Sequence, residues 1–357
     1  VRPVHRLVAM HGSEIINVKA LGVQSSNVTE GHRFESPNET VTLSNADTYA
    51  EQLCTDGAVI ASYSERRADI QKQLLEKSKS EGLTPIEDAE LLDEVTSLVE
   101  LPNVLLCQFD EDFLTVPPEC LILTMKLNQK YFPLLDATGK LTNKFLLVSN
   151  IKPDDASEVI GGNERVVRPR LADAKFFFDQ DKKSTLEARI GGLDKVVYHN
   201  KLGTQGERVA RVRAIAKSIG SLLDGEAMAS LADRAAKLAK ADLLTEMVGE
   251  FPELQGIMGG YYARHDGETA SVATAIEDHY KPRFSGDELP RDSVGVAVAL
   301  ADKLETLVGL FGIGQVPTGD KDPFALRRHA LGTIRMLVER ELPLKLDQLI
   351  ALAVPVF

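Results

Sequence analysis

Several kinds of feature are scarce or missing in this sequence. Its three cysteines, Cys54, Cys107 and Cys120, show no C-x-x-C spacing, so neither a disulfide framework nor a zinc site is predicted. No apolar run approaches the roughly 18–20 residues that a membrane span needs, and no signal peptide is visible at the start. We therefore expect a cytoplasmic protein that has no membrane partner.

Basic charge is also in short supply. The chain holds 41 Lys and Arg residues against 53 Asp and Glu residues, which gives a formal net charge of −12. Residues 1–175 carry most of the imbalance, with 18 basic residues against 27 acidic ones. This balance is not that of a nucleic-acid-binding protein, so any contact with RNA must use local basic patches.

The length and the hydrophobic pattern predict two domains of an α+β protein. A chain of 357 residues with 43% hydrophobic residues is long for a single core. Residues 1–155 mix strands and helices, and we expect an antiparallel sheet with an acidic helical hairpin at about 64–100. Residues 156–357 predict an all-α domain. Because the chain opens on Val-Arg-Pro rather than Met, we expect it to be a fragment.

Local patterns predict individual elements. Strands are expected at 14–23, 58–61, 121–127 and 144–149, and the Thr-Gly turn before Leu141 predicts a β-hairpin. Thr84-Pro-Ile-Glu87 is typical of a capping box that starts a helix. In the second half, helices are expected at about 171–181, 184–198, 206–223, 226–248, 254–266, 269–281, 292–312, 323–340 and 344–353. Gly267 suits a helix C-terminus and Asp322-Pro323 a helix start.

Basic residues concentrate at two places. Arg165, Arg168, Arg170 and Lys175 lie within eleven residues, and Arg327-Arg328 follow the later helix start. Guanidinium groups bind phosphate with two parallel hydrogen bonds, so these residues are candidates for binding the phosphate groups of RNA. The alternative is that the arginines pair with nearby carboxylates as part of the fold.

The second half also contains His199, the pair His265-Asp266, and Asp302 in the order H…HD…D. This order is typical of HD-type phosphohydrolases, in which His and Asp side chains hold a divalent metal that activates water. However, His265 precedes a helix end, where the helix dipole favours an imidazolium without any metal. Asp302 lies about 140° from Ala297 on the apolar stripe of its helix, a position as compatible with a solvated carboxylate as with a metal ligand. We expect the four side chains to approach one another as a structural cluster without hydrolytic activity.

Long sequence runs resemble one family. Q-G-I-M-G-G-Y-Y-A-R-H-D-G-E, Y-K-P-R-F-S-G-D-E-L-P and G-D-K-D-P-F-A-L-R-R are similar to the beta subunit of bacterial heterotetrameric glycyl-tRNA synthetase. V-R-P-V-H, G-H-R-F, M-K-L-N-Q-K-Y-F-P and K-L-G-T extend the resemblance over nearly the whole chain.

The resemblance implies a role within a larger enzyme. Residues 1–155 would resemble the B3/B4 region of phenylalanyl-tRNA synthetase, and residues 156–357 an HD-like domain. The alpha subunit would carry the class II active site with its ATP and Mg²⁺, so this fragment would hold no catalytic residue and bind no cofactor. Its partners would be the alpha subunit, in an assembly of two alpha and two beta subunits, and tRNA-Gly. The family also implies a portion before Val1 and an anticodon-binding domain beyond Phe357.

Three functions follow from these patterns. The chain is expected to be the tRNA-binding and assembly portion of a glycine–tRNA ligase. The alternatives are an HD-type divalent-metal phosphohydrolase and an interaction scaffold with a vestigial HD motif.

Overall fold

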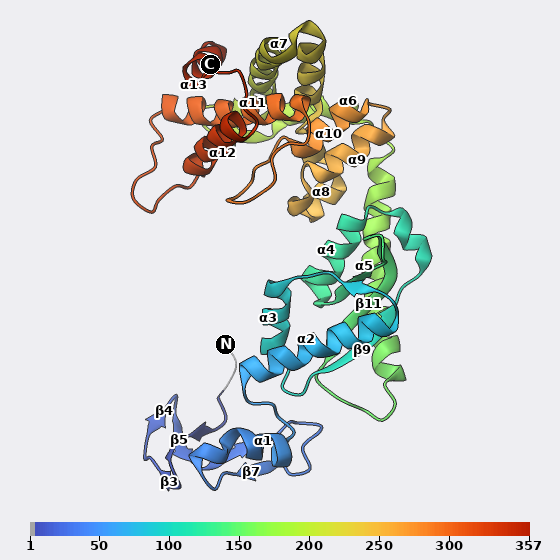
Figure 1. Ribbon diagram of the computed structural model, residues 1–357, viewed down its shortest axis with the longest axis vertical. Coiled ribbons are helices and arrows are strands. Elements are labelled where there is room, and N and C mark those ends of the chain that lie inside the picture. Colours follow the sequence, from blue (N-terminus) through green and yellow to red (C-terminus); the bar gives the residue numbers. More distant parts are fainter. Residues whose placement is uncertain (1–3) are drawn as a thin grey trace. The chain divides into compact units, whose positions relative to one another are not determined.

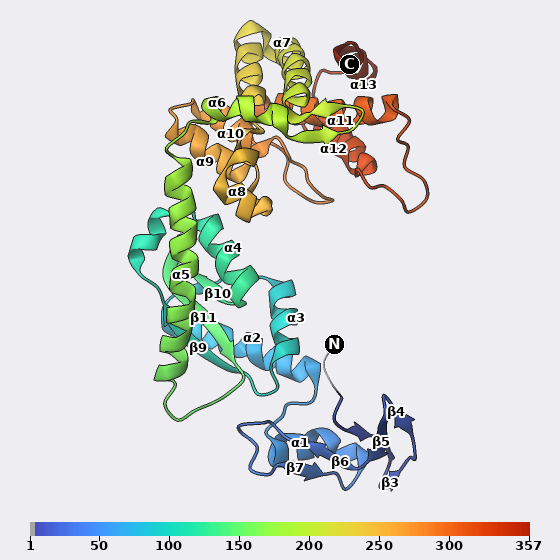
Figure 2. The same cartoon turned by 180° about the vertical axis from the view of Figure 1, so that it is seen from behind.

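The computed structural model describes residues 4–357, and the chain divides into two compact units, Val1–Lys175 and Phe176–Phe357 (Figures 1 and 2). The run V-R-P-V-H therefore begins outside the described residues. The α+β class is confirmed, since small sheets occur together with many helices. Within residues 4–357, every helix is too short or too polar to cross a membrane.

The first unit combines short strands with helices. Its strands are β1 Leu7–Val8, β2 Met10–His11, β3 Glu14–Ile15, β4 Lys19–Ala20, β5 Val23–Ser26, β6 Val28–Glu30, β7 Thr40–Thr42, β8 Thr84–Pro85, β9 Asn103–Gln108, β10 Phe132–Leu135 and β11 Leu141–Ser149. Its helices are α1 Tyr49–Gly57, α2 Tyr63–Ser80, α3 Ala89–Leu98, α4 Pro118–Gln129 and most of α5, Ser157–Asp181. The division between the units lies inside α5.

Residues 4–57 form the first part of this unit. The strand expected at 14–23 is instead three short strands, β3, β4 and the start of β5, joined by turns. β5 pairs with β4 in antiparallel fashion and with β1 in parallel. Val41, Leu43 and Leu53 form a small core under α1. The strand expected at 58–61 is absent, because Ala58 ends α1 in the left-handed conformation, with a φ of 52°, and residues 59–61 pair with no strand.

A four-stranded antiparallel sheet in the order β8-β10-β11-β9 forms the second part (Figure 2). The predicted hairpin is confirmed as β10 and β11. Its turn is held by Asp136, whose carboxylate accepts hydrogen bonds from the backbone of Thr138 and Lys140. The helices α2 and α3 pack on this sheet through Ile70 and Leu91, which belong to the core cluster.

Two further local predictions for this unit were wrong. Residues 121–127 lie in α4 and not in a strand. Pro118 occupies the first turn of α4, and Cys120, Leu121, Thr124 and Met125 are buried at helical spacing. Thr84 belongs to β8 rather than to a capping box. The helix α3 begins at Ala89, where the Asp88 side chain accepts a hydrogen bond from the Leu91 amide.

The second unit is helical apart from one hairpin. It contains α6 Leu186–Arg189, α7 Gln205–Leu238, α8 Glu246–Glu250, α9 Ile257–His265, α10 Ala270–Asp278, α11 Ser293–Gly312, α12 Leu326–Glu339 and α13 Leu346–Ala353. The strands β12 Val197–His199 and β13 Gly203–Thr204 form the hairpin. The prediction of an all-α domain is corrected at this point, and the helix expected at 184–198 is reduced to α6 and a 3-10 segment, Ile190–Lys195.

The helix α11 lies at the centre of the second unit and contacts α7, α10, α12 and α13 (Figure 1). Every residue from Val294 to Thr306 is buried. Of the two interpretations of Asp302, the solvated carboxylate is therefore excluded, because α11 has no solvent-facing side over these residues. A helix surrounded by others must bury its polar residues as well as its apolar ones.

Local backbone turns and caps set the ends and the kink of the helices around α11. The two arms of α7 meet at Asp224 and Gly225, and Gly225 has a φ of 73°. Gly267 follows α9 with a φ of 86°, which confirms its predicted role at a helix end. The helix α12 begins at Leu326 rather than at Pro323, but Asp322 accepts hydrogen bonds from the Leu326 and Arg327 amides, so it caps this helix.

Candidate functional site

Asp302 and Glu305 of α11 are the centre of a buried charged cluster. Asp302 is 3% exposed and Glu305 is 0% exposed, and most of the other buried residues of α11 are apolar. A buried carboxylate needs a positive partner and hydrogen bonds to remain ionised. Asp302 and Glu305 are three residues apart, so both point to the same side of α11.

Three cations on α7 and its end neutralise these carboxylates. Arg208 donates through Nη2 to Asp302 Oδ1 at 3.1 Å and through Nε to Glu305 Oε2 at 3.0 Å. The Lys240 Nζ atom lies 3.1 Å from Asp302 Oδ1, and Arg211 Nε donates to Glu305 Oε1 at 2.9 Å. We call these five residues the buried charged cluster.

The cluster fixes the charges of its members. Burial alone would raise the pKa of Asp302, but Arg208 and Lys240 outweigh it and hold that pKa well below its ordinary range. Burial lowers the pKa of Lys240 to about 8, although Asp302 partly opposes this shift. The Tyr280 ring also lies under Lys240, with Nζ 3.8 Å from the ring centroid. Asp302 is therefore ionised and saturated by protein cations.

Two further buried polar groups border the cluster. The His279 Nδ1–H donates to the Ile276 carbonyl at 2.6 Å, and burial, then the charge of Lys240, lowers the pKa of His279 well below its usual value. Asp242 accepts from the amides of Gly256 and Gly259 at 2.5 and 3.1 Å, and burial raises its pKa to about 6. Among residues 4–357, His279 Nε2 and Asp242 Oδ1 are buried without a hydrogen-bond partner.

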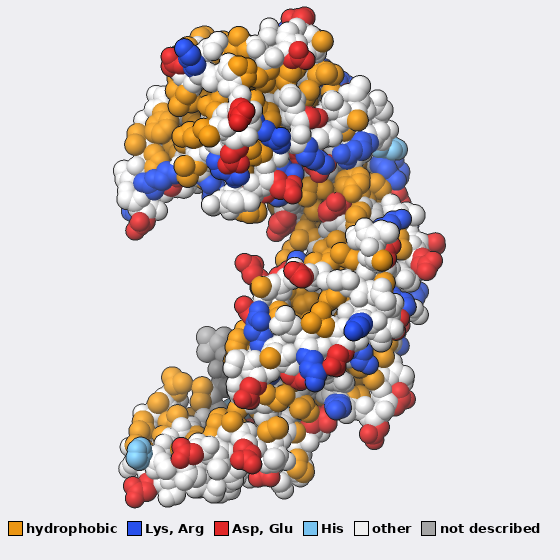
Figure 3. Space-filling view, in the orientation of Figure 1, with side chains coloured by type: hydrophobic (Ala, Val, Ile, Leu, Met, Phe, Trp, Pro, Cys, Tyr) orange, Lys and Arg blue, Asp and Glu red, His pale blue; other side chains and the backbone are white. Residues whose placement is uncertain are grey.

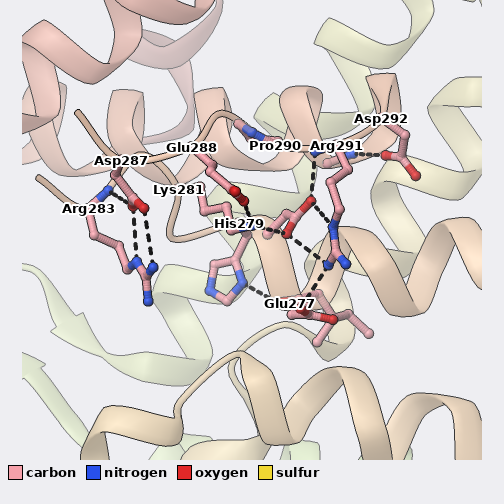
Figure 4. Close-up of polar contacts among 12 residues, drawn as sticks. Glu277, His279, Lys281, Arg283, Asp287, Glu288, Pro290, Arg291 and Asp292 are labelled. Atoms are coloured by element: carbon pink, nitrogen blue, oxygen red, sulfur yellow. Dashed lines mark hydrogen bonds and ion pairs between the residues drawn. The ribbon is translucent and has the colours of Figure 1, made fainter. Parts of the chain in front are cut away.

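The loop between α10 and α11 is fixed by ion pairs (Figure 4). Asp278 is 0% exposed and accepts from the amide, Nε and Nη2 of Arg291 at 2.7–2.9 Å. Lys281 Nζ lies 3.1 Å from the same carboxylate. Further along, Asp287 accepts from both the amide and the guanidinium of Arg283. The quoted run Y-K-P-R-F-S-G-D-E-L-P is thus an ordered loop.

A hollow with several basic side chains opens between this loop and α12. Its volume is about 370 Å³, and its lining includes Arg283, Lys303, Arg328 and His329. Lys303 is 2% exposed and donates to the Tyr280 carbonyl at 3.1 Å. Arg328, one of the predicted tRNA-binding residues, is exposed and donates to the Arg283 carbonyl at 3.4 Å.

The four predicted metal ligands lie in different surroundings. The Asp266 carboxylate accepts from the Leu186 amide at 2.7 Å. His199 accepts from the Lys201 amide at 3.1 Å and its ring contacts Phe324 edge to face, whereas His265 is exposed at the end of α9. Asp302 belongs to the buried charged cluster.

The expectation that these four side chains approach one another as a structural cluster is corrected, because the contacts of Asp266, His199 and Asp302 are made with other residues. No three His, Cys, Asp or Glu side chains within residues 4–357 are grouped so that they could hold a metal ion. The physical reason is visible at Asp302, where two protein cations take up the charge that a metal would neutralise. This geometry does not favour the phosphohydrolase alternative.

The predicted basic run lies on α5. Arg165, Arg168 and Arg170 are exposed, and none of them forms an ion pair with a carboxylate in the described part of the chain. Lys175 is half-buried and its Nζ lies 3.5 Å from the Thr115 hydroxyl. Arg327 is exposed in the first turn of α12.

Sequence reasoning missed Arg208 and Lys240. The signal was present, because Arg208 opens the run R-V-A-R-V-R and Lys240 stands among alanines in A-K-L-A-K-A-D. Cations at such positions must face a carboxylate if their helix is packed on several sides. Their partner, however, is 94 residues away from Arg208 and could not be identified from local patterns.

Comparisons with known proteins agree with the family resemblance of the long sequence runs. A family model described as "Glycyl-tRNA synthetase beta subunit" matches residues 1–357. Curated proteins named "Glycine--tRNA ligase beta subunit" from Polaromonas naphthalenivorans and Thiobacillus denitrificans are 69% and 68% identical to the chain. Both alignments cover 100% of this chain but only 50% and 51% of the relative, so the chain spans about half the length of these proteins.

Proposed function

Because the chain belongs to the glycyl-tRNA synthetase beta subunit family, we propose that it is the tRNA-binding and assembly portion of a glycine–tRNA ligase beta subunit. Its proposed partners are tRNA-Gly and the alpha subunit, in an assembly of two alpha and two beta subunits. Glycine activation with ATP and Mg²⁺ would take place on the alpha subunit. This portion would therefore position the RNA rather than catalyse the reaction.

The observation that carries this proposal is the group of exposed arginines on α5. Several exposed arginines of this acidic chain pair with carboxylates, among them Arg283 and Arg291. Arg165, Arg168 and Arg170 form no such pairs within the described residues. Their positive charge is thus available to bind phosphate groups. The arginines around α10 and α11 are already ion-paired and do not have such free charge.

The helix geometry decides how many phosphates these arginines can reach. At 3.6 residues per turn, Arg165 and Arg168 lie about 60° apart on one side of α5. Arg170 lies about 140° from Arg165, so it projects to the other side. An RNA backbone crossing α5 would therefore contact Arg165 and Arg168 together, and Arg170 would contact a different phosphate.

Salt dependence of tRNA binding tests this proposal. The triple variant Arg165→Ala, Arg168→Ala, Arg170→Ala is prepared in the complete enzyme, and binding of tRNA-Gly is measured over a range of salt concentrations. Each lost phosphate contact should reduce the slope of log K against log salt by roughly 0.7–0.9. We expect weaker binding and a reduction of about two slope units for three lost contacts.

The control removes the same charge elsewhere. Lys72, Lys77 and Lys79 are exposed on α2, and their triple alanine variant should leave the slope almost unchanged. An unchanged slope in the arginine variant would contradict the proposal. Equal reductions in both variants would indicate a general charge effect and would contradict it as well.

A further inference from the structure

A large apolar groove lies in the second unit between α11, α12 and α13. Its volume is about 1030 Å³, which exceeds most small-molecule pockets. The walls include Phe311, Ile334, Leu346, Ile350, Val354 and Phe357, each between 42% and 55% exposed. In the space-filling view, hydrophobic side chains gather on the face that carries α12 and α13 (Figure 3). Exposed apolar surface of this extent marks an interaction site.

Two of the three charged groups that line the groove are already paired within the protein, and the third, Lys201, is exposed. Arg211 pairs with Glu305, and the Glu207 carboxylate accepts from the Thr204 amide at 2.8 Å in a capping box. The groove is therefore suited to an apolar protein segment rather than to RNA, because its walls are mainly apolar and Lys201 is its one cation without an ion-pair partner among the described residues.

Phe357 is fixed inside the groove. Its ring packs on Gly309, where a Cβ atom would lie 2.7 Å from the ring, and the Arg211 guanidinium stacks on it at 4.8 Å from the centroid. Residues that continue the chain after Phe357 would therefore start in the groove. A segment tethered there has an effective concentration in the millimolar range for short linkers, which no separate partner matches at ordinary concentrations.

We propose that the segment following Phe357 in the full-length protein packs into this groove with an apolar helical or extended face. The relatives are about twice as long as the chain, so about half of each relative lies outside residues 1–357. This proposal does not depend on the proposed function, since it concerns packing within one subunit.

Photocrosslinking in the full-length protein identifies the occupant. A photoreactive amino acid replaces Ile334 in one sample and Leu222 in the control. These residues are 45% and 43% exposed, but Leu222 lies on α7 and does not line the groove. We expect the Ile334 probe to crosslink to residues beyond position 357 of the same chain, and the Leu222 probe not to do so.

Substitution supplies an independent measurement. The double variant Ile334→Asp, Ile350→Asp places two carboxylates in the groove of the full-length protein. A covered groove would bury them without partners, so the Tm should fall well below that of the Leu222→Asp, Leu75→Asp control, whose sites are 43% and 54% exposed.

Three outcomes would overturn the proposal. They are crosslinks from Ile334 to the alpha subunit, crosslinks to a second copy of this chain, and no crosslink together with equal Tm values for the two double variants. If the aspartate variant does not fold while the control does, the groove is covered, and the crosslink then identifies the occupant.

Discussion

Asp302 is a single carboxylate on which two buried cations depend. Replacing it with Asn keeps its size but leaves Arg208 and Lys240 without their shared negative partner. Removing one member of a buried ion pair costs about 3–5 kcal/mol because the remaining charge is uncompensated. We expect Asp302→Asn to lower the free energy of unfolding by about this amount, as measured by urea denaturation.

The control for this prediction is Asp93→Asn. Asp93 pairs with Arg67 on the surface, and the two side chains are 52% and 32% exposed. Solvent screens such a pair, so the stability should change far less. Equal losses in the two variants would show that Asp302 contributes no more than a surface ion pair.

Asp242 should make the free energy of unfolding fall as the pH rises. A carboxylate that is ion-paired in the folded state has the opposite effect. Its pKa is about 6 in the folded protein and about 3.9 in an unfolded chain. The folded state therefore binds more protons between these values, and the contribution of Asp242 to stability is lost as the pH rises from about 4 to about 6.

The Asp242→Asn variant lacks this titration. The wild type should lose about 3 kcal/mol relative to the variant across that pH interval, which urea denaturation at several pH values measures. Parallel stability curves for the two proteins would contradict the prediction.

At the scale of elements, α9 and α10 pack closely because Gly259 lies between them. A Cβ atom at this position would lie 2.7 Å from Ile276 Cγ2 and 3.0 Å from Asp242 Oδ2. Gly259→Ala should therefore destabilise the protein by about 1–3 kcal/mol. Gly249→Ala is the matched change, since its Cβ would meet nothing within 4 Å; thermal unfolding should show it to be neutral or slightly stabilising. A tolerated Gly259→Ala would mean that the two helices can separate without cost.

The elements that the sequence predicts correctly are those determined locally. The hairpin of β10 and β11 follows from a turn whose carboxylate, Asp136, binds its own backbone neighbours. The strand expected at 121–127 failed because its apolar run fits either period, and Pro117-Pro118 was the overlooked sign of a helix start. The kink of α7 separates the two helices expected at 206–223 and 226–248, so their boundary was predicted well.

The candidate site was harder to predict than the elements. The exposed positions of Arg165, Arg168 and Arg170 could be expected from the sequence, but the absence of carboxylate partners within the described residues could not. The metal hypothesis at Asp302 failed because its environment depends on Arg208 and Lys240, which are distant in sequence. Contacts of this kind follow from tertiary packing and leave no local pattern.

At the scale of the whole molecule, we expect this chain alone to form no glycyl-adenylate. The sequence has no class II active-site pattern, and its proposed role is RNA binding. ATP–pyrophosphate exchange with glycine should therefore be at background for residues 1–357, and it should appear when the alpha subunit is present. Glycine-dependent exchange by this chain alone would contradict the assignment.

The tight turn of α7 also sets an order of events during folding. A Cβ atom at Gly220 would lie 2.9 Å from Ala229 Cα, so the two arms touch within a few residues of the turn. Closing so short a loop costs little entropy, whereas the contact of Arg208 with Asp302 closes 94 residues. The α7 hairpin can thus form early and the charged cluster only when α11 docks. A destabilising substitution at the turn would lower the folding rate. A destabilising substitution at Asp302 would mainly raise the unfolding rate.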